Sequence, residues 1–320
     1  MALNTRISNI IILLVYASIC NAQNEKNIPI GGQKSDGKPL PESLSTKTLL
    51  WQVSGNGLEK PSFLYGTIHM LCAEDAVLSD GLKNAIAKSD QVYLEVDMDN
   101  LFEMLGTLKN MKMRGDTTLS DLLSKKDYEK VKHYFEEKSS LLPFSMLETY
   151  KPFLAAATIL ESNIECESLP MEQVIMEEAK KNKKSIKGLE SMSYQMSIFD
   201  SIPYKNQAEQ LVQYIDHADN KDDNKEYEEL VSAYKKQDLQ KLEELTKQTD
   251  MGMANYVDLL LYNRNRNWVK KLKTLMQEKS LVIAVGAGHL PGENGVINLL
   301  RKAGYTVTPM QNKIRKSTEI

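Results

Sequence analysis

The chain has 320 residues, of which 42% are hydrophobic and 26% are charged, a composition typical of a folded protein and not of a disordered or fibrous one. Lys and Arg number 40 against 43 Asp and Glu, so the charge gives no reason to expect nucleic acid or an anionic membrane as the main partner. We therefore expect a smaller or less charged partner and no nucleic acid.

Residues 1–22 predict a signal peptide. Arg6 precedes the apolar run "IIILLVYASIC" at residues 10–20, and small residues lead to a cleavage point after Ala22. A membrane anchor is the alternative, but this run is far shorter than the roughly 20 apolar residues that span a bilayer. Cleavage predicts an exported protein (periplasmic, envelope-associated or secreted) with no transmembrane segment after processing.

The chain has three cysteines, and each raises a separate question. Cys20 suggests a lipoprotein, but Ile19 stands where a lipoprotein signal places a small residue, so lipidation is not expected. Export would leave Cys72 and Cys166 in an oxidising compartment. A disulfide between them and two free buried thiols are equally compatible with the sequence.

The sequence after the signal peptide divides into a linker, one domain and a tail. Residues 23–47 are polar and rich in Gly, Pro, Ser and Lys, which predicts a flexible linker. The domain covers residues 48–312, and residues 313–320 form the tail. Its strands are predicted from short β-rich runs at residues 48–54, 62–69, 91–97, 185–189, 281–286 and 305–309.

Two segments have the order strand, helix, strand. Within residues 62–97, Leu82, Ala85 and Ile86 follow helical spacing between two β-rich runs, so those two strands should be parallel. Residues 281–309 repeat the plan, with Gly304 as a helix stop.

The segment from about 115 to 278 is mostly helical and forms a large insertion, interrupted only by the run at 185–189. Its helical patterns occupy residues 123–138, 145–162, 170–183, 206–218, 225–237 and 238–248. The expected fold class is α/β, with a parallel or mixed central sheet whose ligand-binding edge the insertion covers. Ligands of α/β proteins bind in crevices at the carboxyl ends of the strands.

Two Gly-x-x-His turns are the first candidate for chemistry. "GTIH" ends at His69 and "GAGH" ends at His289, and both stand where a strand gives way to a turn. Gly66, Gly286 and Gly288 allow the backbone to bend or to approach closely. A single histidine at a strand end is more often structural, but two in the same context among only 4 histidines favour a shared site.

Acidic residues at other strand ends supply carboxylates. Glu95 and Asp97 share one face of the strand "QVYLEVD", and Glu190 ends "SIKGLE". Two imidazoles with one or two carboxylates suit a divalent metal such as zinc, manganese or cobalt, with an open position for water. A carboxylate that does not ligate the metal can act as general base. In the alternative, Asp97 and Glu190 merely cap the segments that follow them.

A third polar group is "YNRNRNW", in a helical context. Helical spacing places Arg264 and Trp268 on one face and Arg266 on another. An inward Arg264 can clamp a carboxylate or stabilise an oxyanion, whereas a solvated face anchored by Trp268 is the simpler reading. His133 and His217 lie in charged helical stretches and are predicted to be on the surface.

"VGAGHLPGENG" invites comparison with a dinucleotide-binding loop. The third glycine of that fingerprint falls on Pro291, and no acidic residue ends a strand about 20 residues later. We therefore expect no nucleotide cofactor.

Five motifs in order resemble the TraB/GumN family, which is related to the TIKI metalloproteases. They are "FLYGTIHML", "LKNAIAKSDQVYLEVD", "KSIKGLESMSYQ", "RNRNW" and "VIAVGAGHLPGENGVINLLRKAGYTV", and the match runs from about Leu49 to Met310. The resemblance implies a TraB/GumN/TIKI-like α/β fold, distantly like that of the erythromycin esterases, with paired Gly-x-x-His motifs forming a metal-dependent peptidase site.

Carried over residue by residue, the resemblance implies metal ligands at His69, His289 and Glu95. It implies further site residues at Glu190, Gln195 and Arg264.

The leading hypothesis is a metal-dependent hydrolase that cuts a peptide or protein substrate, with Glu95 or Glu190 as base and Arg264 steadying the oxyanion. Other members of the family are linked to polysaccharide gene clusters or to shutting down peptide pheromones, so a non-catalytic envelope protein that binds a peptide or glycan is an alternative. A metal-free hydrolase with a histidine as base is the third hypothesis. Substrate identity and oligomeric state are not written in the sequence.

Overall fold

The computed structural model describes residues 47–138, 142–162, 164–217, 223–248 and 256–314. The predicted signal peptide, the lipidation position Cys20, the linker up to residue 46 and the tail from residue 315 lie outside the described residues. All the candidate site residues lie within them.

All six predicted β-rich runs form strands of one sheet: β1 (Leu50–Ser54), β2 (Ser62–Thr67), β3 (Gln91–Val96), β4 (Ser185–Glu190), β5 (Leu281–Gly286) and β6 (Thr306–Pro309). Their order across the sheet is β4-β3-β5-β2-β1-β6. The first four strands in this order are parallel to one another, whereas β1 is antiparallel to both β2 and β6. The sheet is therefore mixed, one of the two predicted forms.

Helices fill the connections between the strands. Before β4 these are α2 (Asp80–Lys88), α3 (Leu101–Thr107), η2 (Leu108–Met111), η3 (Arg114–Asp116), α4 (Leu119–Leu122), α5 (Lys125–Glu137), α6 (Phe144–Leu147), α7 (Pro152–Ser162) and α8 (Met171–Lys181). After β4 they are α9 (Met192–Ile198), η4 (Phe199–Ser201), α10 (Tyr204–His217), α11 (Asp223–Lys235), α12 (Leu239–Gln248), η6 (Asp258–Tyr262), α13 (Asn263–Glu278), η7 (Ala287–His289) and α14 (Val296–Lys302).

The strand–helix–strand prediction for residues 62–97 is confirmed. Ser79 caps α2 by accepting a hydrogen bond from the backbone N–H of Leu82, and Leu82, Ala85 and Ile86 form its buried face. The helix carries the chain from β2 past β5 to β3, and β2 and β3 are both parallel to β5. The connection therefore sets two strand ends at the same edge of the sheet.

One helical pattern divides where the sequence predicted continuity. Residues 145–162 were expected to be one helical stretch, but α6 ends at Leu147 and α7 begins at Pro152. Proline lacks the N–H that a helix interior needs and disfavours helix in the residue before it, so it begins a helix instead. Tyr150, just before this point, forms an isolated bridge with Lys112.

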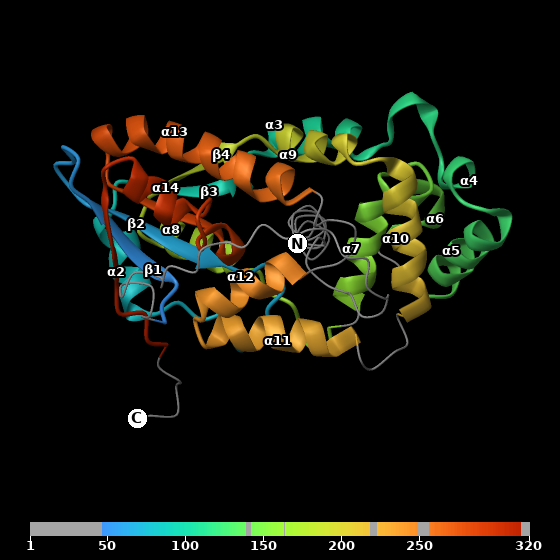
Figure 1. Cartoon of the computed structure of the whole chain (residues 1–320), viewed down its shortest axis with the longest axis horizontal. Helices are drawn as coiled ribbons and strands as arrows, with labels where there is room; N and C mark the ends of the chain where they lie inside the picture. Colours follow the sequence, from blue (N-terminus) through green and yellow to red (C-terminus); the bar gives the residue numbers. More distant parts are fainter. Residues whose placement is uncertain (1–46, 139–141, 163, 218–222, 249–255, 315–320) are drawn as a thin grey trace, which may run out of the picture.

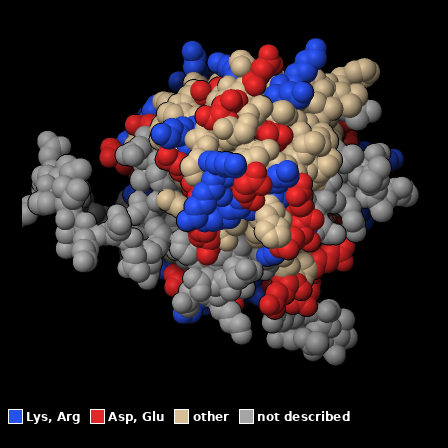
Figure 2. Space-filling view, turned by 90° about the vertical axis from the view of Figure 1, so that its right-hand side faces the viewer, with Lys and Arg blue, Asp and Glu red and all other residues tan. Residues whose placement is uncertain are grey.

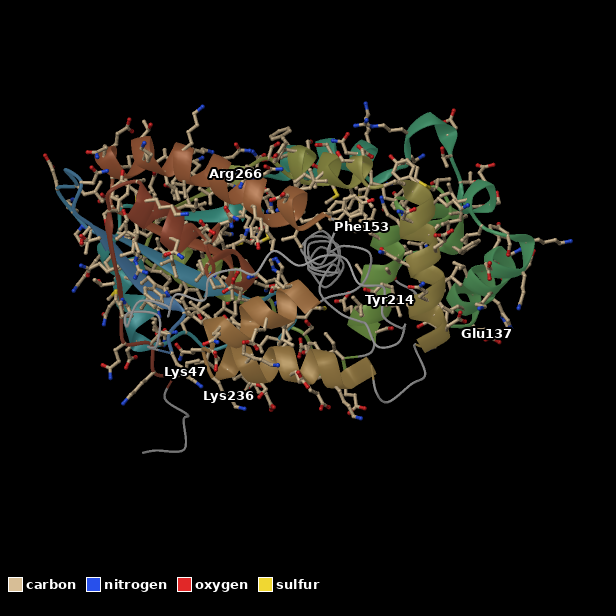
Figure 3. The ribbon with its side chains drawn as sticks, in the orientation of Figure 1. Lys47, Glu137, Phe153, Tyr214, Lys236 and Arg266 are labelled. Carbon is tan, nitrogen blue, oxygen red and sulfur yellow. A yellow bond between two sulfur atoms is a disulfide. The ribbon has the colours of Figure 1, made fainter. Side chains whose placement is uncertain are left out.

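The described residues form two hydrophobic clusters. The larger surrounds the sheet, where α2 packs on α8 and α13 packs on α14 (Figure 1). The smaller lies among α5, α7 and α10 at the other end of the molecule, and includes Phe153 and Tyr214 (Figure 3). The helical insertion thus has a core of its own beside the sheet.

The surface of the helical end agrees with the balanced composition. In the face turned to the viewer in Figure 2, the Lys and Arg side chains are intermixed with Asp and Glu. His133 is exposed there on α5, beside Glu137 at 3.5 Å, as predicted for a surface histidine. None of the described helices combines the length and apolar character that crossing a bilayer demands.

Candidate active site

Four neighbouring strands bring four predicted residues to one edge of the sheet. Glu190 ends β4, Glu95 is the second-last residue of β3, His289 lies in the turn η7 directly after β5, and His69 follows β2 by two residues. Since these strands are parallel and adjacent, their carboxyl ends share an edge. Glu95, His69 and His289 are all buried there, at 5, 5 and 2% exposure.

The glycines of the two Gly-x-x-His motifs make different contacts. A side chain on Gly66 would place its Cβ 3.0 Å from Leu290 Cδ1 and 3.1 Å from Ala287 Cα, so glycine lets β2 approach the turn that carries His289. The backbone N–H of Gly286 donates a 2.8 Å hydrogen bond to Glu95 Oε1. Gly288 lies against Thr246 of α12, whose Oγ1 would be 3.1 Å from an added Cβ.

Arg264 links the carboxylates of the two adjacent strands. Its Nη2 lies 2.5 Å from Glu95 Oε2 and 2.7 Å from Glu190 Oε1, and its Nε donates to Glu190 Oε1 at 2.9 Å. Its Nη1 donates to the Leu260 carbonyl at 3.0 Å and lies 3.3 Å from His289 Nε2. These contacts account for the five N–H groups of a guanidinium.

A local change of helix type precedes Arg264. Residues Asp258–Tyr262 form one turn of π-helix that leads into α13, and such turns recur at functional sites. Arg264 and Trp268 are buried on one face of α13, whereas the side chain of Arg266 is 46% exposed (Figure 3). The Trp268 indole N–H donates to Glu190 Oε2 at 2.9 Å, and its ring packs under the guanidinium of Arg264.

The hydrogen bonds of Asn265 determine the tautomer of His289. The Asn265 amide nitrogen donates to the carbonyls of His289 and Asn294, so its Oδ1 is the acceptor for His289 Nδ1 at 2.6 Å. His289 therefore carries its proton on Nδ1, and the lone pair on Nε2 faces Arg264 and Glu95. Burial lowers the pKa of His289 to about 3, with Arg264 adding to this shift and Glu95 opposing it. The ring is neutral at physiological pH.

The pKa values of the two carboxylates of the site are shifted in opposite directions. Burial alone would raise the pKa of Glu95, but Arg264, the two histidines and the Gly286 N–H outweigh it and lower that pKa to about 2. Burial raises the pKa of Glu190 despite its contacts with Arg264 and Trp268. Glu95 is therefore held as a carboxylate.

His69 lies beside a carboxylate that the sequence analysis did not single out. Its Nδ1 is 2.7 Å from Glu172 Oε2, and both side chains are nearly inaccessible, at 6 and 4%. The charge of His69 also lowers the pKa of both Glu95 and His289, so the second imidazole lies within electrostatic reach of the first. The structure thus places both Gly-x-x-His histidines at the edge of the sheet that carries Glu95.

Several buried polar atoms at this edge have no hydrogen-bond partner among the described residues. They are Thr67 Oγ1, Gln195 Oε1 and Glu172 Oε1. Buried polar groups are normally paired, so these atoms indicate a site that receives a further polar group. The types of donor group present at this edge, imidazole and carboxylate, suit a divalent metal.

These donors are of the types that bind a metal, but their positions do not yet form a metal site. Within the part of the chain that the structure describes, no three His, Cys, Asp or Glu side chains are gathered closely enough to hold a metal ion. His289 Nε2 lies 3.7 Å from Glu95 Oε1 and 3.3 Å from the guanidinium of Arg264. Metal binding by these two residues therefore requires the Arg264 contact to be exchanged.

Other predicted residues differ in how they join this group. Gln195 does join it, because its amide nitrogen donates to Glu95 Oε2 at 3.1 Å. Asp97 instead accepts from the backbone N–H of Asp99, a local turn contact. Ser191, and not Glu190, caps α9, so the capping alternative does not describe Glu190.

Sequence reasoning missed Glu172 and Asn265, and treated Trp268 only as an anchor. Asn265 follows Arg264 directly, so its place in a polar helical segment was the available signal. Glu172 lies in the first turn of a helix after Leu169 and Pro170, a context that gives no indication of function.

Comparisons with known proteins identify a family and several relatives. A model of the TraB/PrgY/gumN family matches residues 49–309. "Metalloprotease TIKI1" of Danio rerio is 23% identical, over 81% of this chain and 62% of that protein. "Metalloprotease TIKI1" of Homo sapiens is 20% identical over 88% and 66% of the two chains, and "Metalloprotease TIKI homolog" of Nematostella vectensis is 24% identical over 81% and 66%.

The matched region spans less than two thirds of the length of these relatives. No solved structure matches the chain.

Proposed function

This chain belongs to the TraB/PrgY/gumN family, and on that premise we propose that it is an exported hydrolase that cuts peptide bonds in a peptide or protein substrate. One observation carries the proposal: His69, Glu95 and His289 are buried at the ends of three adjacent strands, at one edge of the sheet. Arg264 contacts Glu95 and His289 there. Buried charges and imidazoles without a packing purpose are costly, and they concentrate where chemistry needs them.

His69, His289 and Glu95 are the residues that would hold a divalent metal (zinc, manganese or cobalt). When bound there, such a metal supplies a Lewis acid that polarises the scissile carbonyl and a bound water whose pKa falls toward about 7. His289 is prepared for this role because Asn265 holds its Nδ1 proton, which leaves the lone pair on Nε2.

The remaining residues contribute charge and position. Arg264 is the shared counter-ion of Glu95 and Glu190, and it stabilises an oxyanion only if one of its present contacts is exchanged for substrate. Of the two carboxylates proposed as general base, Glu190 is the better suited by protonation, because its pKa is raised whereas that of Glu95 is lowered to about 2.

Export is supported by the pairing of the cysteines. The structure contains a disulfide between Cys72 and Cys166, and disulfides persist in oxidising compartments and are rare in the cytosol. A signal peptide cleaved after Ala22 would deliver the chain to such a compartment. Recovery of uncleaved protein from the cytosolic fraction of its host would contradict this part of the proposal.

A metal-free hydrolase is the second candidate, and the position of Arg264 favours it. The guanidinium lies 3.3 Å from His289 Nε2, where a cationic ligand of that nitrogen would have to approach. In this version the protein's own hydrogen-bond donors stabilise the oxyanion and a histidine acts as base.

The test is hydrolysis of a mixed synthetic peptide library, followed by mass spectrometry of the products. Wild type and the His289→Ala variant are compared with His133→Ala, which changes an exposed histidine on the far helical end. We expect cleavage by wild type and His133→Ala, and none by His289→Ala.

Metal content and chelation separate the candidates. Stoichiometric metal and loss of cleavage with chelator support the metal-dependent enzyme, whereas undiminished cleavage in chelator supports the metal-free one. Peptide binding without cleavage under any condition would contradict both, and would favour a non-catalytic envelope protein that binds a peptide or glycan.

A further inference from the structure

We infer that Glu172 is a positioning residue for His69, fixing the ring so that its Nε2 is the nitrogen presented to the site. The inference rests on the proposed function only in that His69 takes part in its chemistry. The placement of Glu172 beside His69 is a feature of the structure itself.

The burial of Glu172 is the first observation. Its side chain is 4% exposed, and apart from the contact with His69 neither oxygen accepts a hydrogen bond from the residues that the structure describes. A buried carboxylate with so few donors costs stability unless it serves a partner. The one charged or chargeable partner within 4 Å in the described chain is the Nδ1 of His69.

Glu172 also stands near the N-terminus of a helix. It is the second residue of α8, which is 11 residues long and has Pro170 as its N-cap. Backbone N–H groups and the helix dipole favour negative charge at this end of a helix. The first turn of α8 therefore places the carboxyl group of Glu172 against the imidazole of His69.

The backbone around the two residues holds them in register. Segments 68–73 and 167–171 form an irregular ladder: Leu169 N–H donates to the Leu71 carbonyl at 2.8 Å, Met171 N–H to the Ile68 carbonyl at 3.1 Å and Ala73 N–H to the Glu167 carbonyl at 2.9 Å. The Cys72–Cys166 disulfide closes the far end of this ladder. His69 and Glu172 stand at its near end, so neither can shift without breaking it.

Both histidines of the site thus have an acceptor beside Nδ1, but the acceptor is a different chemical group in each case. His289 gives its Nδ1 proton to the amide oxygen of Asn265, and His69 presents Nδ1 to the carboxylate of Glu172. An acceptor at Nδ1 selects the tautomer whose lone pair is on Nε2. The two acceptors differ, since one is a carboxyl group on α8 and the other is an amide on α13.

The test uses protein labelled with ¹⁵N at histidine, because the chain has only 4 histidines and the His69→Ala variant identifies the His69 signals. In metal-free wild type at mildly alkaline pH, we expect the ¹⁵N shifts of His69 to report a proton on Nδ1. In Glu172→Met the ring should change to the Nε2–H form that free imidazole side chains prefer, whereas Glu172→Gln, which keeps an oxygen acceptor, should retain the wild-type form.

Controls separate a positioning role from general damage. The signals of His289 should remain unchanged in all variants, and Glu177→Gln, an exposed glutamate on the same helix, should match wild type. Zn²⁺ titration should show affinity about 10- to 100-fold weaker in Glu172→Met than in wild type. Thermal melts verify that each variant is folded.

The outcomes for this inference and for the proposed function are distinct. A wild-type His69 with its proton on Nε2 overturns the inference without any variant, as do identical His69 signals in wild type and folded Glu172→Met. If wild type binds no Zn²⁺, metal dependence fails, but the tautomer of His69 still decides the role of Glu172.

Discussion

Arg264 and Glu95 form a buried ion pair at the centre of the site, with Nη2 2.5 Å from Oε2 and both side chains about 5% exposed. Glu190 binds the same guanidinium from the next strand. Two buried carboxylates thus share one cation, and His289, also buried, is kept neutral. This arrangement makes Arg264 as important for stability as for chemistry.

Replacing Arg264 with methionine should destabilise the protein by about 3–5 kcal/mol, because it leaves Glu95 and Glu190 buried without their counter-ion. Urea unfolding measures the change. Arg266→Met is the matched control, since that side chain is exposed on the same helix, and it should change stability by no more than about 0.5 kcal/mol. Equal losses in the two variants would show that the buried network is not what stabilises this region.

Gly66→Ala should cost about 1–3 kcal/mol by overpacking. The added Cβ would meet Leu290 Cδ1 at 3.0 Å and the Ala287 backbone at 3.1 Å, which forces the turn carrying His289 away from β2. Thermal melts and the ring signals of His289 report the change. Gly106→Ala on α3 is the control: no atom lies within 4 Å of the added Cβ, and alanine should stabilise that helix by up to about 1 kcal/mol.

Acid should destabilise the protein, and His289 should account for part of this pH dependence. The pKa of His289 is lowered from 6.5 to about 3, so between these pH values the unfolded chain binds a proton that the folded chain does not. Stability of the metal-free protein therefore falls as pH decreases through this window, by about 1.4 kcal/mol per pH unit for this one group. Glu95 adds to the loss between about pH 4.5 and 2, whereas Glu190, with a raised pKa, opposes it.

Urea unfolding across that window checks the sign. The His289→Gln variant has an amide in place of the ring. The slope of its free energy of unfolding against pH should be smaller than that of wild type by the contribution of about one proton. Parallel slopes for the two proteins would mean that His289 is protonated in the folded state.

Much of this edge of the sheet could be predicted from the sequence, because the alternation of side chains along a strand and the position of a strand end are local properties. The six β-rich runs, the βαβ order and the placement of Arg264 and Arg266 on different faces of one helix all follow from spacing along the chain, whereas the sequence left open whether Arg264 is buried. The convergence of His69 and His289 was predicted from the parallel strands, since those strands end at one edge.

Contacts between distant segments were not predictable in this way. Glu172 lies 103 positions from His69 (172 minus 69), and only the ladder between their segments brings them together. The same ladder decides between the two readings of Cys72 and Cys166, which the sequence left open. The packing of His289 likewise depends on a distant helix, because its ring centroid lies 4.5 Å from that of Trp268 and its Nδ1 is hydrogen-bonded to Asn265.

Loss of the Cys72–Cys166 disulfide should weaken both the fold and the site. The bond joins residues 94 positions apart, and for a loop of this length the chain-entropy model gives a stabilisation of about 4–5 kcal/mol, with removal of native disulfides typically costing about 2–5. The double variant Cys72→Ala with Cys166→Ala should therefore melt at lower temperature. Since the ladder beside the bond positions His69 against Glu172, we also expect the His69 ring to lose its fixed tautomer before the protein unfolds.

Comparing two measurements in this variant separates the two effects. Thermal melts report global stability, and ¹⁵N shifts of the four histidines at a temperature well below the melt report local order. Disturbed His69 signals beside unchanged His289 signals would show that the disulfide acts on one half of the site. Undisturbed signals for both rings, together with a lowered melting temperature, would limit the disulfide to a role in global stability, because the hydrogen-bonded ladder alone would then suffice to hold His69 in place.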